Sequence, residues 1–146
     1  MTASNTPHSN EPIPLDQPLP HRKIIREWLI PLSERTTFLA FVLLIVDYAL
    51  FFALIAGTIA FDAVWAKLLC GLAAGFVIGR LFIIGHDACH QSLTPHRELN
   101  KVLGRIAFLP SLTPYSLWDT GHNVVHHGYT NLKNFDFVWA PYTPEE

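Results

Sequence analysis

Two long and almost uninterrupted apolar runs dominate the hydrophobic pattern of this chain. The first covers residues 37–61 and contains Asp47 as its one charged residue, and the second covers residues 63–85 and is interrupted by Lys67 and Arg80. A helix needs about 20 apolar residues to cross the hydrocarbon core of a bilayer. Because almost no chain separates the two runs, they predict an antiparallel helical hairpin in an all-α, integral membrane fold.

Shorter amphipathic segments flank the two runs. Residues 21–33 interleave arginine and lysine with isoleucine, leucine and tryptophan, which is typical of a helix lying in the headgroup region. Residues 98–109 alternate in a similar way and predict a second interfacial helix, closed by Pro110. A further helical stretch is expected after Pro114. Ahead of all these segments, the proline-rich residues 1–20 predict a disordered tail.

Charge adds an orientation to this picture. Basic residues precede the first apolar run and follow the second, so the positive-inside rule places both flanks of the hairpin in the cytosol; these residues are Arg22, Lys23, Arg26, Arg35, Arg97, Lys101 and Arg105. The formal net charge is only −2 and the lysines and arginines are scattered, so the chain lacks the electrostatic footprint of a nucleic-acid-binding protein.

Charged residues within the apolar runs call for partners. A carboxylate inside a membrane span costs a few kcal/mol unless it is paired or protonated, and such residues often mark function. For Asp47 the plainer interpretation is a hydrogen bond to another helix, either in this chain or outside it. We expect Arg80, near the inner end of its run, to extend toward the headgroups. Trp118 and Trp139 are expected to be interface anchors.

Five of the eight histidines form two tight clusters directly after the hairpin. His86 and His90 are four residues apart, as are His122 and His126, and this spacing places each pair on one helix face. Imidazole nitrogen is a common ligand of iron, zinc and copper. His127 lies about 100° further round a helix than His126, so it should reach a second metal or another edge of the same one.

Three other polar residues near the clusters are candidates to support the histidines. Asp87 and Asp119 are candidates to orient a ligand imidazole through its other nitrogen, with Asn123 as a third candidate. The two acids are equally well explained as solvated residues at helix starts. The remaining histidines are interpreted as ordinary surface or core residues; they are His8, His21 and His96.

The clusters resemble the histidine boxes of the membrane fatty acid desaturases. Residues 85–90, Gly-His-Asp-Ala-Cys-His, resemble the first box, and residues 118–131, which contain His-Asn-Val-Val-His-His and end in Thr-Asn, resemble the second. The resemblance extends over about residues 37–144. It implies a non-haem diiron centre, with two iron ions bound by the five clustered histidines and dioxygen as co-substrate.

The resemblance also implies partners and a location. The substrate would be an acyl lipid or a fatty acyl thioester (acyl-CoA type), and the electrons would come from ferredoxin or a cytochrome b5-type donor. The protein would be a multi-pass membrane protein of the bacterial cytoplasmic membrane or the endoplasmic reticulum, with its histidine boxes on the cytosolic side.

The chain departs from the family pattern in one respect. The third box, another His-x-x-His-His, and the pair of spans that should precede it are not found in this sequence. Two irons with four or more protein ligands each need about eight donors, and the clusters offer five. We therefore interpret residues 34–146 as the N-terminal part of a desaturase domain and expect this chain alone to be inactive.

Two alternatives remain at this stage. A lipid or carotenoid hydroxylase or ketolase of the same superfamily uses the same boxes, so the boxes do not separate it from a desaturase. A non-enzymatic haem-binding membrane protein would also use histidines, but it predicts two well-separated ones inside the spans rather than clusters beyond their ends.

Overall fold

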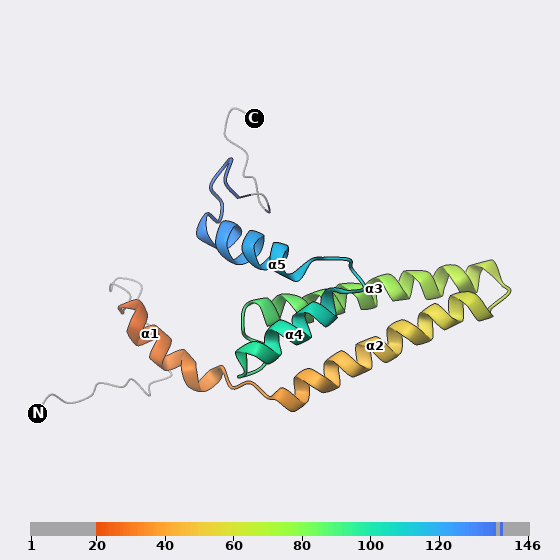
Figure 1. Cartoon of the computed structure of the whole chain (residues 1–146), viewed down its shortest axis with the longest axis horizontal. Helices are drawn as coiled ribbons and strands as arrows, with labels where there is room; N and C mark the ends of the chain where they lie inside the picture. Colours follow the sequence, from red (N-terminus) through yellow and green to blue (C-terminus); the bar gives the residue numbers. More distant parts are fainter. Residues whose placement is uncertain (1–19, 137, 139–146) are drawn as a thin grey trace, which may run out of the picture. The chain divides into compact units, whose positions relative to one another are not determined.

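Every regular element in the part of the chain that the structure describes is a helix, which confirms the all-α prediction (Figure 1). The structure, a computed structural model, describes residues 20–136 and Val138. The chain divides into two units, Met1–Glu34 and Arg35–Glu146, and each is described by itself. The predicted disordered tail, apart from Pro20, and Trp139 lie outside the described residues.

The first unit contains the amphipathic segment. Helix α1 runs over Arg22–Leu29 and continues into the short 3-10 helix η1, Ile30–Leu32. The side chain of His21 caps α1 by accepting a hydrogen bond from the backbone N–H of Lys23, with 3.3 Å between the nitrogen atoms. The segment is therefore helical over nearly the whole range that its sequence pattern indicates, and its place at a membrane surface stays a prediction.

The second unit begins with a hairpin of two long helices. Helices α2, Thr37–Ala60, and α3, Val64–Cys89, run antiparallel and side by side (Figure 1). Both are long and apolar enough to cross a membrane, with mean hydropathies of 2.7 and 2.1. Most of their leucine, isoleucine and phenylalanine side chains are exposed on the hairpin surface, which is what lipid-facing helices require. The second helix extends past the predicted end at residue 85 to Cys89.

An ion pair joins the two long helices. The side chain of Asp47 in α2 is only 2% exposed, and its Oδ1 atom lies 2.9 Å from Nη2 of Arg80 in α3. Arg80 Nε donates to the same oxygen at 3.0 Å. The partner helix of Asp47 therefore lies within this chain, and Arg80 combines this ion pair with a side chain that is 57% exposed. Pairing compensates the cost of placing a carboxylate among apolar side chains.

The helix after the hairpin packs back onto it. Helix α4, Arg97–Phe108, contributes Leu103 and Ala107 to a buried cluster with residues of α2 and α3. The hydroxyl of Tyr48 in α2 donates to the carbonyl oxygen of Ile106 at 2.6 Å. The segment predicted as an interfacial helix thus has one face buried against the membrane hairpin itself.

A buried asparagine fixes the connection between α3 and α4. The side chain of Asn100 accepts hydrogen bonds from the backbone N–H and the hydroxyl of Thr94, at 2.8 and 2.7 Å, and donates to the Thr94 carbonyl at 3.0 Å. Both residues are fully buried, so these bonds are shielded from water. The loop that leaves the first histidine cluster is consequently held in one conformation.

A continuous helical stretch carries the second histidine cluster. Helix α5, Tyr115–Trp118, runs directly into the π-helix η2, Asp119–His126.

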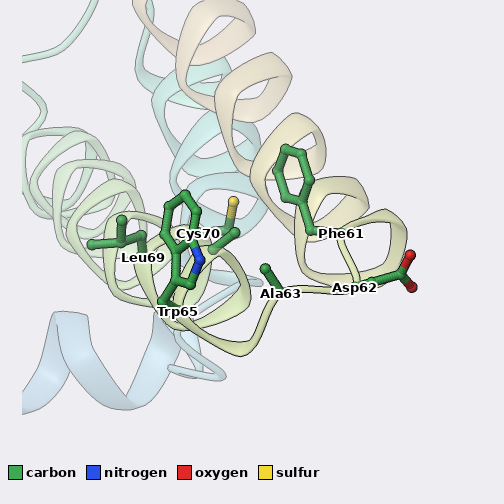
Figure 2. A pocket seen from close by; sticks show the side chains of 7 residues that line it. Phe61, Asp62, Ala63, Trp65, Leu69 and Cys70 are labelled. Carbon is green, nitrogen blue, oxygen red and sulfur yellow. The ribbon is translucent and has the colours of Figure 1, made fainter.

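At the far end of the hairpin, an apolar cavity of about 440 Å³ lies at the α2–α3 turn and is lined by residues that include Phe61, Trp65 and Cys70 (Figure 2). Cys70 and His86 are separated by 16 residues of one helix, about 24 Å, so this cavity is not part of the histidine site.

The unequal exposure of the Asp47–Arg80 pair predicts an asymmetric response to mutation. Arg80→Leu leaves the buried carboxylate without a partner and should lower the free energy of unfolding by about 3 kcal/mol. Asp47→Leu should cost less, because the Arg80 side chain is 57% exposed and can reach the headgroups. The double variant should unfold close to wild type. Thermal unfolding in detergent micelles would measure all three, and equal losses from the two single variants would contradict this explanation.

Candidate metal centre

The first pair of histidines lies where α3 ends. His86 is on the last turn of α3 and His90 is its C-terminal cap, so the four-residue spacing places both rings on one side of the helix end. Their Nε2 atoms lie 3.1 Å apart. The sequence prediction that these two side chains come together agrees with the geometry.

A glycine allows the neighbouring helices to approach this end of α3. A Cβ atom added at Gly85 would lie 2.5 Å from the ring of Phe108, the last residue of α4, which is fully buried. Gly104 in α4 likewise allows α5 to approach, because a Cβ atom at Gly104 would lie 2.5 Å from the ring of Tyr115. These close contacts bring α4 and α5 against the last turns of α3 and so direct the second cluster toward the first.

The π-helix changes which histidines of the second cluster come together. In an α-helix, residues five apart point about 140° from each other, whereas the wider turn of a π-helix brings them closer to one face. His127 Nε2 accordingly lies 3.3 Å from His122 Nε2. The rings of His122 and His126 stack, with centroids 5.2 Å apart. The expectation that His127 reaches a second metal or another edge of the same one stays a prediction, and the structure places its Nε2 atom beside that of His122.

Three ring nitrogens from the two clusters converge, those of His86, His90 and His122, and a fourth adjoins them. His86 Nε2 lies 3.0 Å from His122 Nε2, which in turn lies 3.2 Å from His90 Nε2. With the contact between His86 and His90 this makes a triangle, and His127 adjoins it at His122. His126 lies next to this group, with its ring centroid 5.2 Å from that of His127. The structure thus gathers all five predicted histidines within one small region.

The nitrogen triangle fits a bound metal ion. Two nitrogens that each lie about 2.1 Å from one ion at a right angle are about 3.0 Å apart, which is close to the spacings observed. Without an ion, an Nε2–H of one ring can donate to the lone pair of a neighbouring Nε2 at this distance, since each neutral imidazole has one proton for its two ring nitrogens. Three nitrogens on one face of an ion would leave other coordination positions open.

The local electrostatics favour metal binding. Burial, followed by the positive charge that neighbouring histidines would carry, lowers the pKa of His122 to about 4. The same causes, again with burial first, lower the pKa of His90. Both rings are therefore neutral near pH 7, and a neutral imidazole is the form that binds a metal. His122 Nδ1 is buried without a hydrogen-bond partner among the described residues.

The three polar residues that the sequence suggests as supports for the histidines have different hydrogen-bond partners. The Oδ1 atom of Asp87 lies 3.1 Å from His86 Nδ1, so this carboxylate can hold the ring proton and leave Nε2 free for a metal. Asn123 Nδ2 donates to Asp119 Oδ1 at 2.6 Å and to the Cys89 carbonyl at 3.0 Å. Asp119 and Asn123 therefore connect the π-helix to the end of α3, and Asp87 is the one whose carboxylate contacts a clustered histidine.

One carboxylate at the site was not found by sequence reasoning. Asp136, ten residues beyond His126, places its Oδ1 atom 2.8 Å from His126 Nδ1. The side chain of Asp136 is fully buried. The segment that carries it lacks any periodic pattern. The one sequence feature that could have indicated its role is its short distance along the chain from the second histidine cluster.

Aromatic side chains enclose the other side of the cluster. Trp118, which the sequence suggests as an interface anchor, stacks on His122 with centroids 4.8 Å apart and packs edge-on against Phe82. An apolar cavity of about 370 Å³ adjoins this wall and is lined by Thr113, Leu117, Trp118, Gly121 and His122. A hydrophobic molecule in this cavity would lie directly beside one of the converging imidazoles.

Comparison with known proteins places this arrangement in a family. Residues 62–146, more than half of the chain, match the sequence model of the fatty acid desaturases. Relatives include an sn-1 oleoyl-lipid 12-desaturase of Picosynechococcus, 42% identical over 71 residues, which are 49% of this chain and 20% of that protein. The chloroplastic omega-6 fatty acid desaturase of Arabidopsis thaliana is 39% identical over 72 residues, 49% of this chain and 16% of that protein.

A third relative names an electron donor. The sn-1 acyl-lipid omega-3 desaturase (ferredoxin) of Nostoc is 35% identical over 75 residues, 51% of this chain and 21% of that protein. The matched part of this chain thus spans about a fifth of the length of these relatives. No solved structure matches the chain.

The contact at Gly85 gives a prediction with an internal control. Gly85→Ala gains up to about 1 kcal/mol of helix propensity, but the clash with Phe108 should outweigh it, for a net loss of about 1–2 kcal/mol and a displaced α4. Gly75→Ala, on the same helix with open space around it, should be neutral or stabilising. Thermal unfolding in detergent would compare the two variants; a Gly85→Ala protein at least as stable as Gly75→Ala would contradict the packing argument.

Proposed function

Because this chain belongs to the fatty acid desaturase family, we propose that it provides histidine ligands for a pair of iron ions that introduce a double bond into the acyl chain of a membrane lipid. The main support is the convergence of Nε2 atoms from His86, His90, His122 and His127, all within 3.0–3.3 Å of a neighbour. His126, with its Nδ1 turned toward a carboxylate, is the fifth ligand.

Two irons need more donors than these residues offer. Four or more ligands per ion require about eight, whereas the two clusters contribute five. The relatives named above are about five to six times as long as the region that they share with this chain. We propose that the remaining ligands come from sequence outside this chain, and that these 146 residues alone do not complete the centre.

The proposed reaction sets definite tasks for the protein. Two hydrogens leave adjacent carbons of the acyl chain, and dioxygen is reduced to two waters with two electrons and two protons from outside. Iron supplies the oxidising power that an unactivated C–H bond requires. In this proposal, burial keeps the His90 and His122 imidazoles neutral, Asp87 holds the proton of His86 on Nδ1, and the aromatic wall of Phe82 and Trp118 excludes water.

The substrate and its path follow from the surroundings of the cluster. The hairpin would span the membrane, and α3 would bring its histidines to the point where it leaves the lipid. The apolar cavity beside His122 is suited to the methylenes of an acyl chain. Because two of the relatives carry names of acyl-lipid enzymes, a lipid-linked acyl chain is the favoured substrate over a thioester.

The electrons would arrive from the other side of the site. Basic residues flank both ends of the hairpin, and by the positive-inside rule they support a cytosolic location of the clusters. A soluble or membrane-bound one-electron donor then has access to them, and the name of the Nostoc relative favours ferredoxin over a cytochrome b5-type protein.

Metal binding tests the first step of this proposal. The product of the complete reading frame that encodes this chain, purified in detergent under anaerobic conditions, should bind Fe²⁺. His86→Ala should weaken binding by more than the roughly 10–100-fold that loss of an orienting partner costs. His96→Ala is the matched control, because this exposed histidine lies at the start of α4 and should leave binding unchanged. Equal binding by wild type and His86→Ala would refute the proposed ligand set.

Product analysis tests the reaction. Expression of the same reading frame, with ferredoxin, in a host whose membranes contain saturated and monounsaturated acyl lipids should yield acyl chains that have lost two hydrogens. Mass spectrometry of the extracted lipids would measure this loss. A gain of one oxygen without loss of hydrogen would instead identify a hydroxylase, and a protein that binds haem without altering lipids would refute an oxidative role for the cluster.

A further inference from the structure

We propose that Asp136 is a positioning residue that fixes the His126 ring so that its Nε2 atom faces a metal ion. This inference rests on the proposed function, since it concerns a metal ligand. Asp136 lies ten residues after His126, and its Oδ1 atom is 2.8 Å from His126 Nδ1. It differs from Asp87 at His86, whose carboxylate is 47% exposed, because the Asp136 side chain is fully buried.

The carboxylate of Asp136 also binds the backbone of its own loop. Its Oδ2 atom accepts from the N–H of Asn131 at 3.0 Å, and Oδ1 accepts from the N–H of Val138 at 2.9 Å. Asn131 and Asn134 have φ angles of 64° and 72°, a left-handed conformation that asparagine tolerates better than most residues. These turns reverse the chain after His126 and bring Asp136 back to the ring.

The bond to Nδ1 decides which nitrogen of His126 can bind a metal. A carboxylate is an acceptor only, so Nδ1 must carry the ring proton and Nε2 keeps its lone pair. The two backbone N–H groups hold the carboxylate in place, and the carboxylate in turn restricts rotation of the ring. Stacking on His122, with centroids 5.2 Å apart, restrains the ring on its face. His126 is thereby prepared as a ligand before any ion binds.

A double-mutant cycle tests this role through metal binding. The measured quantity is Co²⁺ affinity and the visible ligand-field spectrum of the protein made from the complete reading frame. Asp136→Asn keeps the size of the side chain but removes its charge and one acceptor, and should weaken Co²⁺ binding by about 10–100-fold and change the spectrum. On a His126→Ala background the same substitution should change affinity by less than about 3-fold, because the ring through which it acts is gone.

A control separates the ring contact from general loosening of the loop. The hydroxyl of Thr130 donates to the backbone carbonyl of His126 at 2.6 Å, so Thr130→Val removes a bond to the same residue but not to its ring. This variant should retain wild-type Co²⁺ affinity and spectrum. Asp136→Glu, which keeps the carboxylate, should recover part of the loss seen with Asp136→Asn.

Each outcome distinguishes this inference from the proposed function. If wild type binds Co²⁺ and Asp136→Asn binds it equally well, Asp136 has no positioning role, although the metal site stands. If the effects of Asp136→Asn and His126→Ala are additive, or if Thr130→Val loses as much affinity as Asp136→Asn, the carboxylate acts on the fold and not through the ring, and the inference is wrong. If wild type binds no metal, the proposed function fails and the inference fails with it.

Discussion

The close packing of the Phe108 ring against Gly85 is the contact on which the rest of the site depends. A side chain at residue 85 would hold α4 away from the end of α3, and α5 follows α4 by a short turn. Because the second histidine cluster is carried by the continuation of α5, its distance from the first cluster is set by this contact. The 3.0 Å distance between the Nε2 atoms of His86 and His122 requires α4 to pack this closely against the end of α3.

Buried polar groups give the apolar hairpin its specific arrangement. Leucine and phenylalanine side chains on α2 and α3 pack in many registers, but the Asp47 carboxylate finds its guanidinium partner on α3 in one of them. Asn100 likewise fixes the loop after the first cluster, and Asp136 fixes the loop after the second. Each is a polar side chain in an environment where an unmet hydrogen bond is costly, so each selects one conformation.

The sequence predicts the hairpin well and the site only in part. Long apolar runs identify α2 and α3 to within a few residues, because the requirement for a membrane span depends on local composition alone. The four-residue spacing of His86 and His90 likewise predicts that their side chains lie on one face of the helix. The partnership of Asp47 with Arg80 and the return of Asp136 to His126 depend on how distant segments fold together, and no local pattern contains that information. The close approach of His127 to His122 is also beyond local prediction, because the π-helix departs from α-helical periodicity.

The π-helix has a consequence for how this region can vary among related sequences. Substitutions on its outer face leave the histidine geometry intact, whereas deletion of a single residue between Asp119 and His126 would favour a return to α-helical winding. The ring of His127 would then rotate away from that of His122. Natural variation is therefore expected to change residues on the outer face of this helix while preserving its length and its histidines.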